Sequence, residues 1–408
     1  MKRDKILRPR LFSAAPVALA LVTAASALAS CAATEADDGH APVDPVVVPE
    51  AGADASLAAD VEVPPDGGCD ASDPTCMAQP ITCAEAAFCP VPTGVSAIHA
   101  LTAVWGSSKD DVWAVGSGGT IVHWDGAVWT AAPQDQTKNT FRAVWGSGPN
   151  DVWVASATDT IFHTTGFAGG PPTWTRAPMV SDDDFGVPVF TAWGVAGGAP
   201  RFGGQAFVRF DDDFEVSFIN QIIATRDAEG GIAWIWDRGA GRAMVNGMWG
   251  SSADDVWVVG DDSTWDGAFG WTAHGTRTGD GDLVWTEVDS RAGAVLRAVW
   301  GSSADDVWAV GDAGKIRRIG ANKTAWEIVP SPTPAVLRAV WGAAADDVWA
   351  VGDHGTILHW DGAAWKPSLA AFPANKKKPH LYGIWGSGPN DVWIVGDGIA
   401  LRHTGGVK

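Results

Sequence analysis

Apolar residues in this chain occur in short runs that repeat, and polar residues fill the gaps between the runs. In the run DVWAVG, Val307 and Ala309 point to one face of an extended strand, while Trp308 and Val310 point to the other. Both faces are apolar, so the pattern predicts a short strand that is buried on both sides. Glycine-containing turns follow these runs, which favours many short strands joined by tight connections.

A Trp-Gly pair marks each copy of a longer repeat. The seven markers begin at Trp105, Trp145, Trp193, Trp249, Trp300, Trp341 and Trp385. The cleanest copies share the order LxAVWG, DVWAVG, TIxHWDG and xxW, which supplies four strand candidates in each copy. Four strands at a period of about 40–50 residues are typical of a β-propeller blade. We therefore predict an all-β fold, a seven-bladed β-propeller of four-stranded blades that occupies residues 81–408.

The seventh copy is incomplete, because it supplies only three strand candidates. These are residues 381–386, 391–396 and 400–404, and no xxW segment follows them. The segment FCPVPTG stands before the first copy, at the place where full copies have their fourth strand. Since an open sheet edge is a liability, we expect about residues 88–92 to complete the seventh blade beside residues 400–404. Cys83 and Cys89 would brace this closure.

The second residue of LxAVWG varies freely between copies, while its neighbours in the motif stay similar. In chain order the residues in this slot are Thr102, Arg142, Phe190, Asn246, Arg297, Arg338 and Tyr382. First strands of propeller blades surround the central channel, and arginine binds carboxylates through two parallel hydrogen bonds. The predicted binding residues at the channel mouth are Thr102, Arg142, Asn246, Arg297, Arg338 and Tyr382. The alternative is that the arginines only pair with nearby Asp-Asp turns.

Acidic pairs precede the second strand in most copies. They are Asp110-Asp111, Asp254-Asp255, Asp305-Asp306 and Asp346-Asp347, with Asn150-Asp151 and Asn390-Asp391 in the same place. A glycosidase uses one pair of carboxylates with different pKa values, so six equivalent pairs around a ring do not form such a site. We interpret them as turn residues whose side chains accept backbone N–H bonds. Weak Ca²⁺ binding is the alternative.

Histidine recurs in the TIxH segment of four copies, as His123, His163, His359 and His403. Equivalent positions on different blades radiate outwards, so these side chains are too far apart to share a metal ion. We expect partly buried, hydrogen-bonded imidazoles, no metal site and no cofactor.

The N-terminal residues have the features of a bacterial lipoprotein signal peptide. Basic residues precede the apolar run from Ala14 to Leu28, and the following Cys31 completes a segment that resembles a lipobox. We expect removal of residues 1–30 and lipidation of Cys31, with an uncleaved anchor or ordinary secretion as the alternative. Residues 31–80 are rich in Ala, Asp, Pro, Val and Gly, which predicts an acidic flexible tether. The predicted location is the bacterial cell envelope, lipid-anchored on an outer-membrane, periplasmic or surface face.

Charge and cysteine content narrow the possible functions. The formal net charge is −20, which argues against nucleic acid as a partner, because phosphate binding needs a basic surface. Beyond Cys31 the chain has Cys69, Cys76, Cys83 and Cys89. An even number outside the cytoplasm suggests two disulfides, whose pairing the spacing alone leaves open. A metal site made of four thiolates is the alternative, although the spacings are not the CxxC pairs of zinc sites.

The order LxAVWG, DVWAVGxxGTIxHWDGxxW resembles the repeat of the photosystem II stability and assembly factor family. That family is part of the larger group of BNR, or Asp-box, propellers, which includes sialidases. The resemblance covers about residues 95–404, and it implies a seven-bladed propeller that is usually a binding or assembly platform and sometimes a glycosidase. One departure is that Asp125 and Trp129 stand four positions apart, as do Asp361 and Trp365, where an Asp-box has five.

Together these features predict a non-catalytic, membrane-anchored and monomeric propeller that binds a protein or glycan partner in the envelope or extracellular space. The slot residues and four apparent insertions, residues 164–173, 181–186, 197–241 and 261–281, would make the contacts. The first alternative is an extracytoplasmic glycoside hydrolase or lyase of the Asp-box propeller type, with carboxylates in those insertions. The second is a propeller lectin that uses tryptophan-rich turns. We interpret the acidic triplets at residues 182–184 and 211–213 as solvated loop charge, with Ca²⁺ binding as the alternative.

Overall fold

The structure is a computed structural model, and all of its described residues belong to the unit Val63–Lys408. It describes residues 81–405, apart from residues 159, 168–169, 179–187, 211–215, 238–240, 265–266, 278, 280–281, 322–323 and 374–376. The predicted signal peptide, Cys31, the predicted tether, Cys69, Cys76 and both acidic triplets lie outside the described residues. Of the residues described, none belongs to a helix with the length and apolar character that a membrane span requires.

The described chain forms seven antiparallel sheets of four strands, so the predicted fold class is confirmed. Blade 1 consists of β2 (Leu101–Ser108), β3 (Asp111–Gly116), β4 (Ile121–Trp124) and β5 (Trp129–Ala131). Blade 2 consists of β6 (Phe141–Gly148), β7 (Asp151–Ser156), β8 (Ile161–Thr164) and β9 (Thr175–Arg176). Blade 3 consists of β10 (Val189–Trp193), β11 (Arg201–Phe210), β12 (Val216–Arg226) and β13 (Ile232–Asp237). Blade 4 consists of β14 (Met244–Ser252), β15 (Asp255–Thr264), β16 (Gly267–Thr276) and β17 (Val284–Glu287).

The remaining three blades follow the same order. Blade 5 consists of β18 (Leu296–Ser303), β19 (Asp306–Gly311), β20 (Ile316–Gly320) and β21 (Glu327–Val329). Blade 6 consists of β22 (Leu337–Ala344), β23 (Asp347–Gly352), β24 (Ile357–Trp360) and β25 (Trp365–Pro367). Blade 7 consists of β26 (Leu381–Gly388), β27 (Asp391–Gly396), β28 (Ile399–His403) and β1 (Cys89–Pro90). Short 3₁₀ turns after second strands are η1 (Ser117–Gly119), η2 (Asp312–Gly314) and η3 (Asp353–Gly355).

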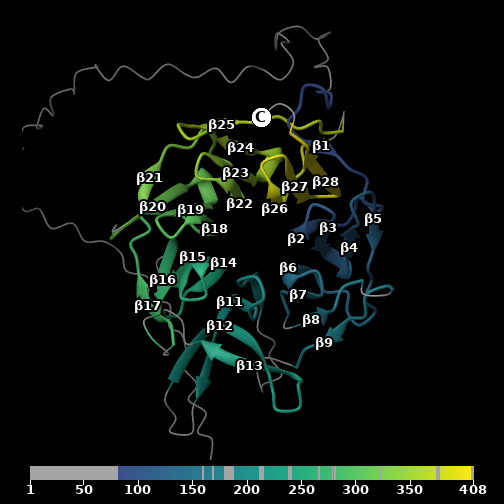
Figure 1. Ribbon diagram of the computed structural model, residues 1–408. Helices are drawn as coiled ribbons and strands as arrows, with labels where there is room; N and C mark the ends of the chain where they lie inside the picture. The colour runs from purple at the N-terminus through teal and green to yellow at the C-terminus, as the bar shows by residue number, and fades with distance from the viewer. Residues whose placement is uncertain are drawn as a thin grey trace, which may run out of the picture. The chain divides into compact units, whose positions relative to one another are not determined.

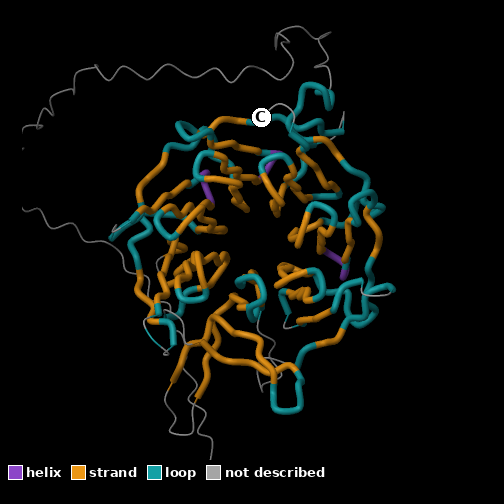
Figure 2. Tube along the Cα trace, in the orientation of Figure 1, coloured by secondary structure: helices purple, strands orange, loops and turns teal. Residues whose placement is uncertain are grey.

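The seven blades stand in a ring around a central opening (Figure 1). Their first strands β2, β6, β10, β14, β18, β22 and β26 contact one another in that order, and β26 contacts β2. Fourth strands such as β9, β13 and β17 lie on the rim, and most of the ring is strand (Figure 2). The first strands are thus the innermost strands of the blades and surround the central opening (Figure 1).

The second strands that carry DVWAVG or a close variant are buried on both sides, as its alternation predicts. In β19 all six residues are buried. Val307 and Ala309 pack in a cluster with Trp257 of blade 4, whereas Trp308 packs in a cluster with Leu337 of blade 6. The apolar residues of one strand therefore join three successive blades.

The predicted closure of the ring is confirmed. Strand β1 pairs with β28, with Cys89 opposite Arg402, and a disulfide joins Cys83 to Cys89. Phe88 is fully buried, and its ring packs edge-on against Trp349 with the centroids 5.1 Å apart. In the other blades this place belongs mostly to a fourth-strand tryptophan, such as Trp365. Phe88 thus replaces the tryptophan that the seventh copy lacks.

The Trp-Gly markers are explained by a contact that repeats around the whole ring. The tryptophan of each marker lies over the glycine of the next blade, in the pairs Trp105 and Gly146, Trp145 and Gly194, Trp193 and Gly250, Trp249 and Gly301, Trp300 and Gly342, Trp341 and Gly386, and Trp385 and Gly106. A Cβ atom added to any of these glycines would lie only 2.5 to 2.7 Å from the nearest ring atom. Glycine is therefore required at the marker because an indole ring occupies the space of a side chain. We call this set of seven contacts the Trp-Gly relay.

Two of the predicted insertions are wrong, because they hold strands of the blades themselves. Residues 197–241 contain β11, β12 and β13, and residues 261–281 contain the end of β15 and all of β16. The hairpin of β15 and β16 stays paired as far as Thr264 and Gly267. Strands β11 to β13 and β16 carry no copy of the repeat motif, whereas β15 begins with the variant DVWVVG and continues beyond it. Antiparallel pairing uses backbone groups that every sequence has.

Candidate functional site

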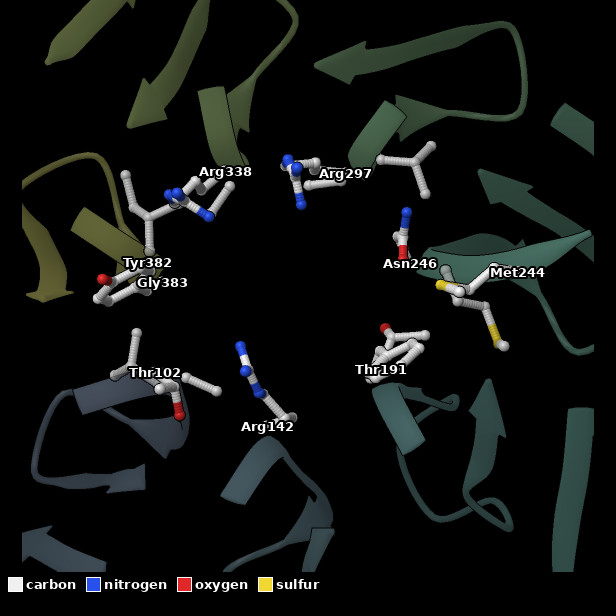
Figure 3. Close-up of a pocket in the computed structure, with 18 residues that line it drawn as sticks. Thr102, Arg142, Thr191, Met244, Asn246, Arg297, Arg338, Tyr382 and Gly383 are labelled. Carbon is white, nitrogen blue, oxygen red and sulfur yellow. The ribbon is translucent and has the colours of Figure 1, made fainter. Parts of the chain in front are cut away.

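The slot residues meet at one end of the central opening, as the sequence predicts. A cavity of about 420 Å³ is lined by residues of all seven first strands. All seven slot residues are in its lining, namely Thr102, Arg142, Phe190, Asn246, Arg297, Arg338 and Tyr382. We call this set the channel mouth. The residue before the slot, such as Leu296 or Leu337, is buried between blades, so alternation along the strand turns the slot residue towards the axis (Figure 3).

Two of the three arginines are already paired with acidic residues. Arg297 donates hydrogen bonds to Asp312, with 2.8 Å from its Nη2 to Oδ2, and Arg338 donates in the same way to Asp353 at 3.0 Å. Burial lowers the pKa of Arg338, but the bonds and charge of Asp353 outweigh burial and raise it. The acidic partners begin the turns after the second strands. The alternative expectation was that the arginines pair with the Asp-Asp turns. It is wrong about the partners, which are Asp312 and Asp353, but right that the charges of Arg297 and Arg338 are compensated.

Blades 6 and 7 extend this pairing along the channel mouth. Asp353 also contacts His380, with 2.7 Å between Oδ1 and Nδ1. Its pKa is raised by burial but lowered further by the bonds from Arg338 and His380, so the net shift is downwards. Tyr382 lies under the guanidinium of Arg338, 5.2 Å from its ring centroid. Burial and the hydrogen-bonded carboxylate of Asp397 raise the pKa of this phenol.

Arg142 differs from the other two arginines. Its side chain is exposed and projects into the centre of the channel mouth (Figure 3). In blade 2 the turn after the second strand has Ala157 at the place that Asp312 and Asp353 occupy in blades 5 and 6. Among the described residues Arg142 has no hydrogen-bond or ion-pair partner. As far as the described ranges go, Arg142 therefore gives the channel mouth a positive charge that no carboxylate compensates.

The side of the channel mouth formed by blades 3 and 4 is mainly apolar. Phe190, Met244 and Met248 line the cavity there. Asn246 donates to the carbonyl of Leu296 at 3.1 Å. The hydroxyl of Thr102 likewise donates to backbone carbonyls, including that of Val115 at 3.2 Å. Both slot residues thus bond to neighbouring backbone, Thr102 in blade 1 and Asn246 in blade 4. The thioethers and phenyl ring near Asn246 provide adaptable apolar contact area.

The acidic pairs lie in turns before second strands, as predicted, but their second members bind side chains. Asp111 accepts hydrogen bonds from Ser107, from Trp113 at 3.2 Å and from the Nε2 of His123 at 2.6 Å. Equivalent contacts join Asp151 to His163, Asp255 to His274, Asp306 to Arg318, Asp347 to His359 and Asp391 to Arg402. The expectation that these carboxylates accept backbone N–H bonds is therefore wrong for the second position.

The hydrogen bonds around Asp111 and its equivalents hold the turns in place and do not have the arrangement of a catalytic triad. Burial raises the pKa of Asp111, but the hydrogen bonds from His123, Ser107 and Trp113 lower it more, so the carboxylate stays ionised. The carboxylate accepts from both the serine and the histidine, whereas a nucleophilic serine needs the histidine as its own base. The predicted buried, hydrogen-bonded imidazoles are confirmed for His123, and equally for His163, His359 and His403. Within the described ranges no three His, Cys, Asp or Glu side chains are grouped to hold a metal ion.

Comparison with known proteins supports the fold. No protein-family model matches the chain, and no curated protein sequence matches it. The structure of YCF48 bound to D1 peptide is similar with a TM-score of 0.57 at 18% identity, over 78% of this chain and 94% of that one. YCF48 from Cyanidioschyzon merolae is similar with a TM-score of 0.57 at 18% identity, over 78% of this chain and 99% of that one. The WD40 β-propeller domain of Doa1 has a TM-score of 0.55 at 11% identity, over 74% of this chain and 92% of that domain. At these identities the likeness concerns the fold alone, a seven-bladed propeller with YCF48, a photosystem II assembly factor, among its structural neighbours.

Proposed function

We propose that this chain is a non-catalytic propeller that binds a protein partner at the channel mouth. The observation that carries the proposal is the uncompensated Arg142 at the centre of a cavity of about 420 Å³. A guanidinium in this place attracts a carboxylate of the partner, because none of the acidic residues in the described part of the chain pairs with it. A YCF48 structure that holds a D1 peptide is an example of a similar fold with a bound peptide. We therefore favour a protein partner over a glycan.

The shape of the channel mouth supports an extended segment as the bound part of the partner. Arg297 and Arg338 keep their carboxylate partners and so form a rigid, neutral wall. Met244 and Met248 of blade 4, the neighbour of Arg297 in the ring, accept apolar side chains. A segment with one acidic residue beside apolar residues matches this arrangement of one charge and one apolar wall.

Replacing Arg142 with Ala is expected to weaken capture of the partner by about tenfold to a hundredfold, the equivalent of about 1.5–3 kcal/mol for a hydrogen bond between charged groups. Crosslinked partners of the tagged full chain are quantified by mass spectrometry for wild type and variant. Arg176→Ala is the matched control, because Arg176 is exposed on the outer strand of the same blade. Equal capture by wild type and Arg142→Ala would overturn the proposed site.

We also propose that a lipid on Cys31 holds the propeller at a membrane of the bacterial envelope. The basic and apolar segments before Cys31 support this assignment. Replacing Cys31 with Ser is expected to move the chain from the membrane pellet to the soluble fraction, because two acyl chains and their anchoring energy are lost. Immunoblots of the separated fractions measure this shift. A Cys31→Ser chain that stays in the pellet after a carbonate wash would contradict lipid anchoring.

A further inference from the structure

A second cavity lies on the same face of the ring as the channel mouth. It has a volume of about 550 Å³, and its walls include Pro90, Pro92, Phe372, Pro373, Pro379 and Ile399. We call it the proline pocket. Its lining also includes Asp397, whose amide donates a hydrogen bond of 3.0 Å to the carbonyl of His380, two residues before Tyr382 of the channel mouth. The two cavities therefore lie next to each other along the segment from His380 to Tyr382.

The walls of the proline pocket are held in place before any partner binds. The connection from β1 to β2 is fixed by hydrogen bonds from the amide of Val91 to Ala400 at 2.9 Å and from Gly398 to His99 at 3.1 Å. The connection from β25 to β26 is fixed by a bond of 2.7 Å from the amide of Gly355 to the carbonyl of Pro379. Proline rings restrict the backbone further. A preformed cavity of this kind loses little conformational entropy when it is filled.

The chemistry of the proline pocket suits an apolar side chain. Carbon-rich side chains of proline, phenylalanine, valine and isoleucine form most of its lining, while Lys377 and Asp397 stand as opposite charges. Next to it, Ile98 is 85% exposed, which extends the apolar surface beyond the pocket. Exposed apolar surface that adjoins a pocket is typical of a protein-binding site.

We infer that the proline pocket takes a Leu or aromatic side chain of the same extended segment whose carboxylate binds Arg142. This inference rests on the proposed function, because it makes the pocket a second anchor of one partner. The backbone bond between Asp397 and His380 supports the link, since it places the pocket next to Tyr382, so that a segment that leaves the channel mouth over blade 7 meets the pocket next. Burying a Leu or Phe side chain contributes about 1.5–3 kcal/mol, which corresponds to about tenfold to a hundredfold in affinity.

The test uses acetylated twelve-residue peptides that contain one Glu and one Leu or Trp at separations of one to nine residues, in a Gly-Ser background. Fluorescence polarisation measures their binding to the folded full chain. We expect one narrow range of separations to bind tightest, and replacement of the Leu or Trp by Ser to weaken that binding by at least about tenfold. Uniformly weak binding at all separations would overturn the two-anchor inference.

A variant that fills the pocket locates the second anchor. Ala97 lines the pocket and is exposed, so Ala97→Trp occupies the cavity without changing the core. We expect it, and the smaller Ala97→Leu, to weaken the best peptide by about tenfold or more. Ser96→Trp is the control, because Ser96 is the exposed neighbour outside the lining. Thermal unfolding midpoints verify that all three variants fold.

The two proposals fail in different ways in this experiment. If Arg142→Ala weakens the peptide while Ala97→Trp and Ala97→Leu do not, the channel mouth stands as the site and the proline pocket is excluded as an anchor. If the Ala97 variants weaken binding while Arg142→Ala has no effect, the proposed function is wrong about its site and the link between the two cavities is lost. Weakening by both, but not by Ser96→Trp, supports both proposals.

Discussion

Replacing Phe88 with Ala is expected to lower the free energy of unfolding by about 3–5 kcal/mol, the usual cost of removing a buried aromatic side chain. Phe88 is fully buried and packs against Trp349 of blade 6 and His403 of blade 7, with ring centroids 5.1 and 5.4 Å away. The carbonyl of its neighbour Ala87 accepts a hydrogen bond of 2.7 Å from the His403 ring. The loss therefore affects both the core and the segment that closes the ring. Denaturant unfolding followed by tryptophan fluorescence measures it.

An exposed apolar residue is the control for Phe88. Val128 is 57% exposed in the turn between β4 and β5, so Val128→Ala is expected to change the unfolding free energy by less than about 0.5 kcal/mol. A Phe88→Ala chain that unfolds at the same denaturant concentration as wild type would show that the N-terminal segment does not stabilise the closed ring. Reduction of the disulfide between Cys83 and Cys89 in the variant should lower stability further, because the closing strand then loses its crosslink.

Adding one methyl group at Gly301 is expected to destabilise the chain by about 1–3 kcal/mol, the usual cost of overpacking. A Cβ atom there would lie 2.5 Å from the Trp249 ring, and its three nearest neighbours all belong to that ring. The clash is thus between one added carbon and one side chain. Thermal unfolding of Gly301→Ala measures the effect.

A double-mutant cycle isolates the contact at Gly301. In a Trp249→Leu background the added methyl group has space, so Gly301→Ala should cost less there than in wild type, by at least about 1 kcal/mol. Gly148→Ala is the matched control, because a Cβ atom at Gly148 meets nothing within 4 Å. Equal costs of Gly301→Ala in both backgrounds would contradict the steric explanation of the Trp-Gly relay.

The architecture could be predicted from the sequence because its determinants are local and repeated. The strand DVWAVG reports burial on both faces, and the missing xxW of the seventh copy pointed to the segment that contains Phe88. Blade 3 shows the limit of this reasoning. Its strands β11 to β13 lack the repeat motif, so backbone pairing alone distinguishes them from an inserted loop.

The location of the candidate site could be predicted from the sequence. Which of its three arginines are neutralised by an acidic partner could not. The slot pattern identified the residues at the channel mouth, yet it treated Arg142, Arg297 and Arg338 as equivalent. The distinguishing signal was present in the sequence, fifteen residues after each slot. Asp312 and Asp353 stand there in blades 5 and 6, whereas Ala157 stands there in blade 2. A contact between two strands of one blade only becomes visible when their register is known.

The Trp-Gly relay makes every contact between blades head-to-tail, since each blade offers an indole to the next and a glycine to the one before. Such heterologous contacts close into a ring only when the rotation between units allows it, and they grow without end when it does not. The Trp-Gly contact itself does not depend on which blade follows which, so circular permutation at the connections between blades is expected to preserve it. A duplicated or deleted copy is likewise expected to leave the remaining Trp-Gly contacts of the same kind. The relay alone therefore does not specify seven blades, and the segment at Phe88 is the part of the chain that completes the seventh.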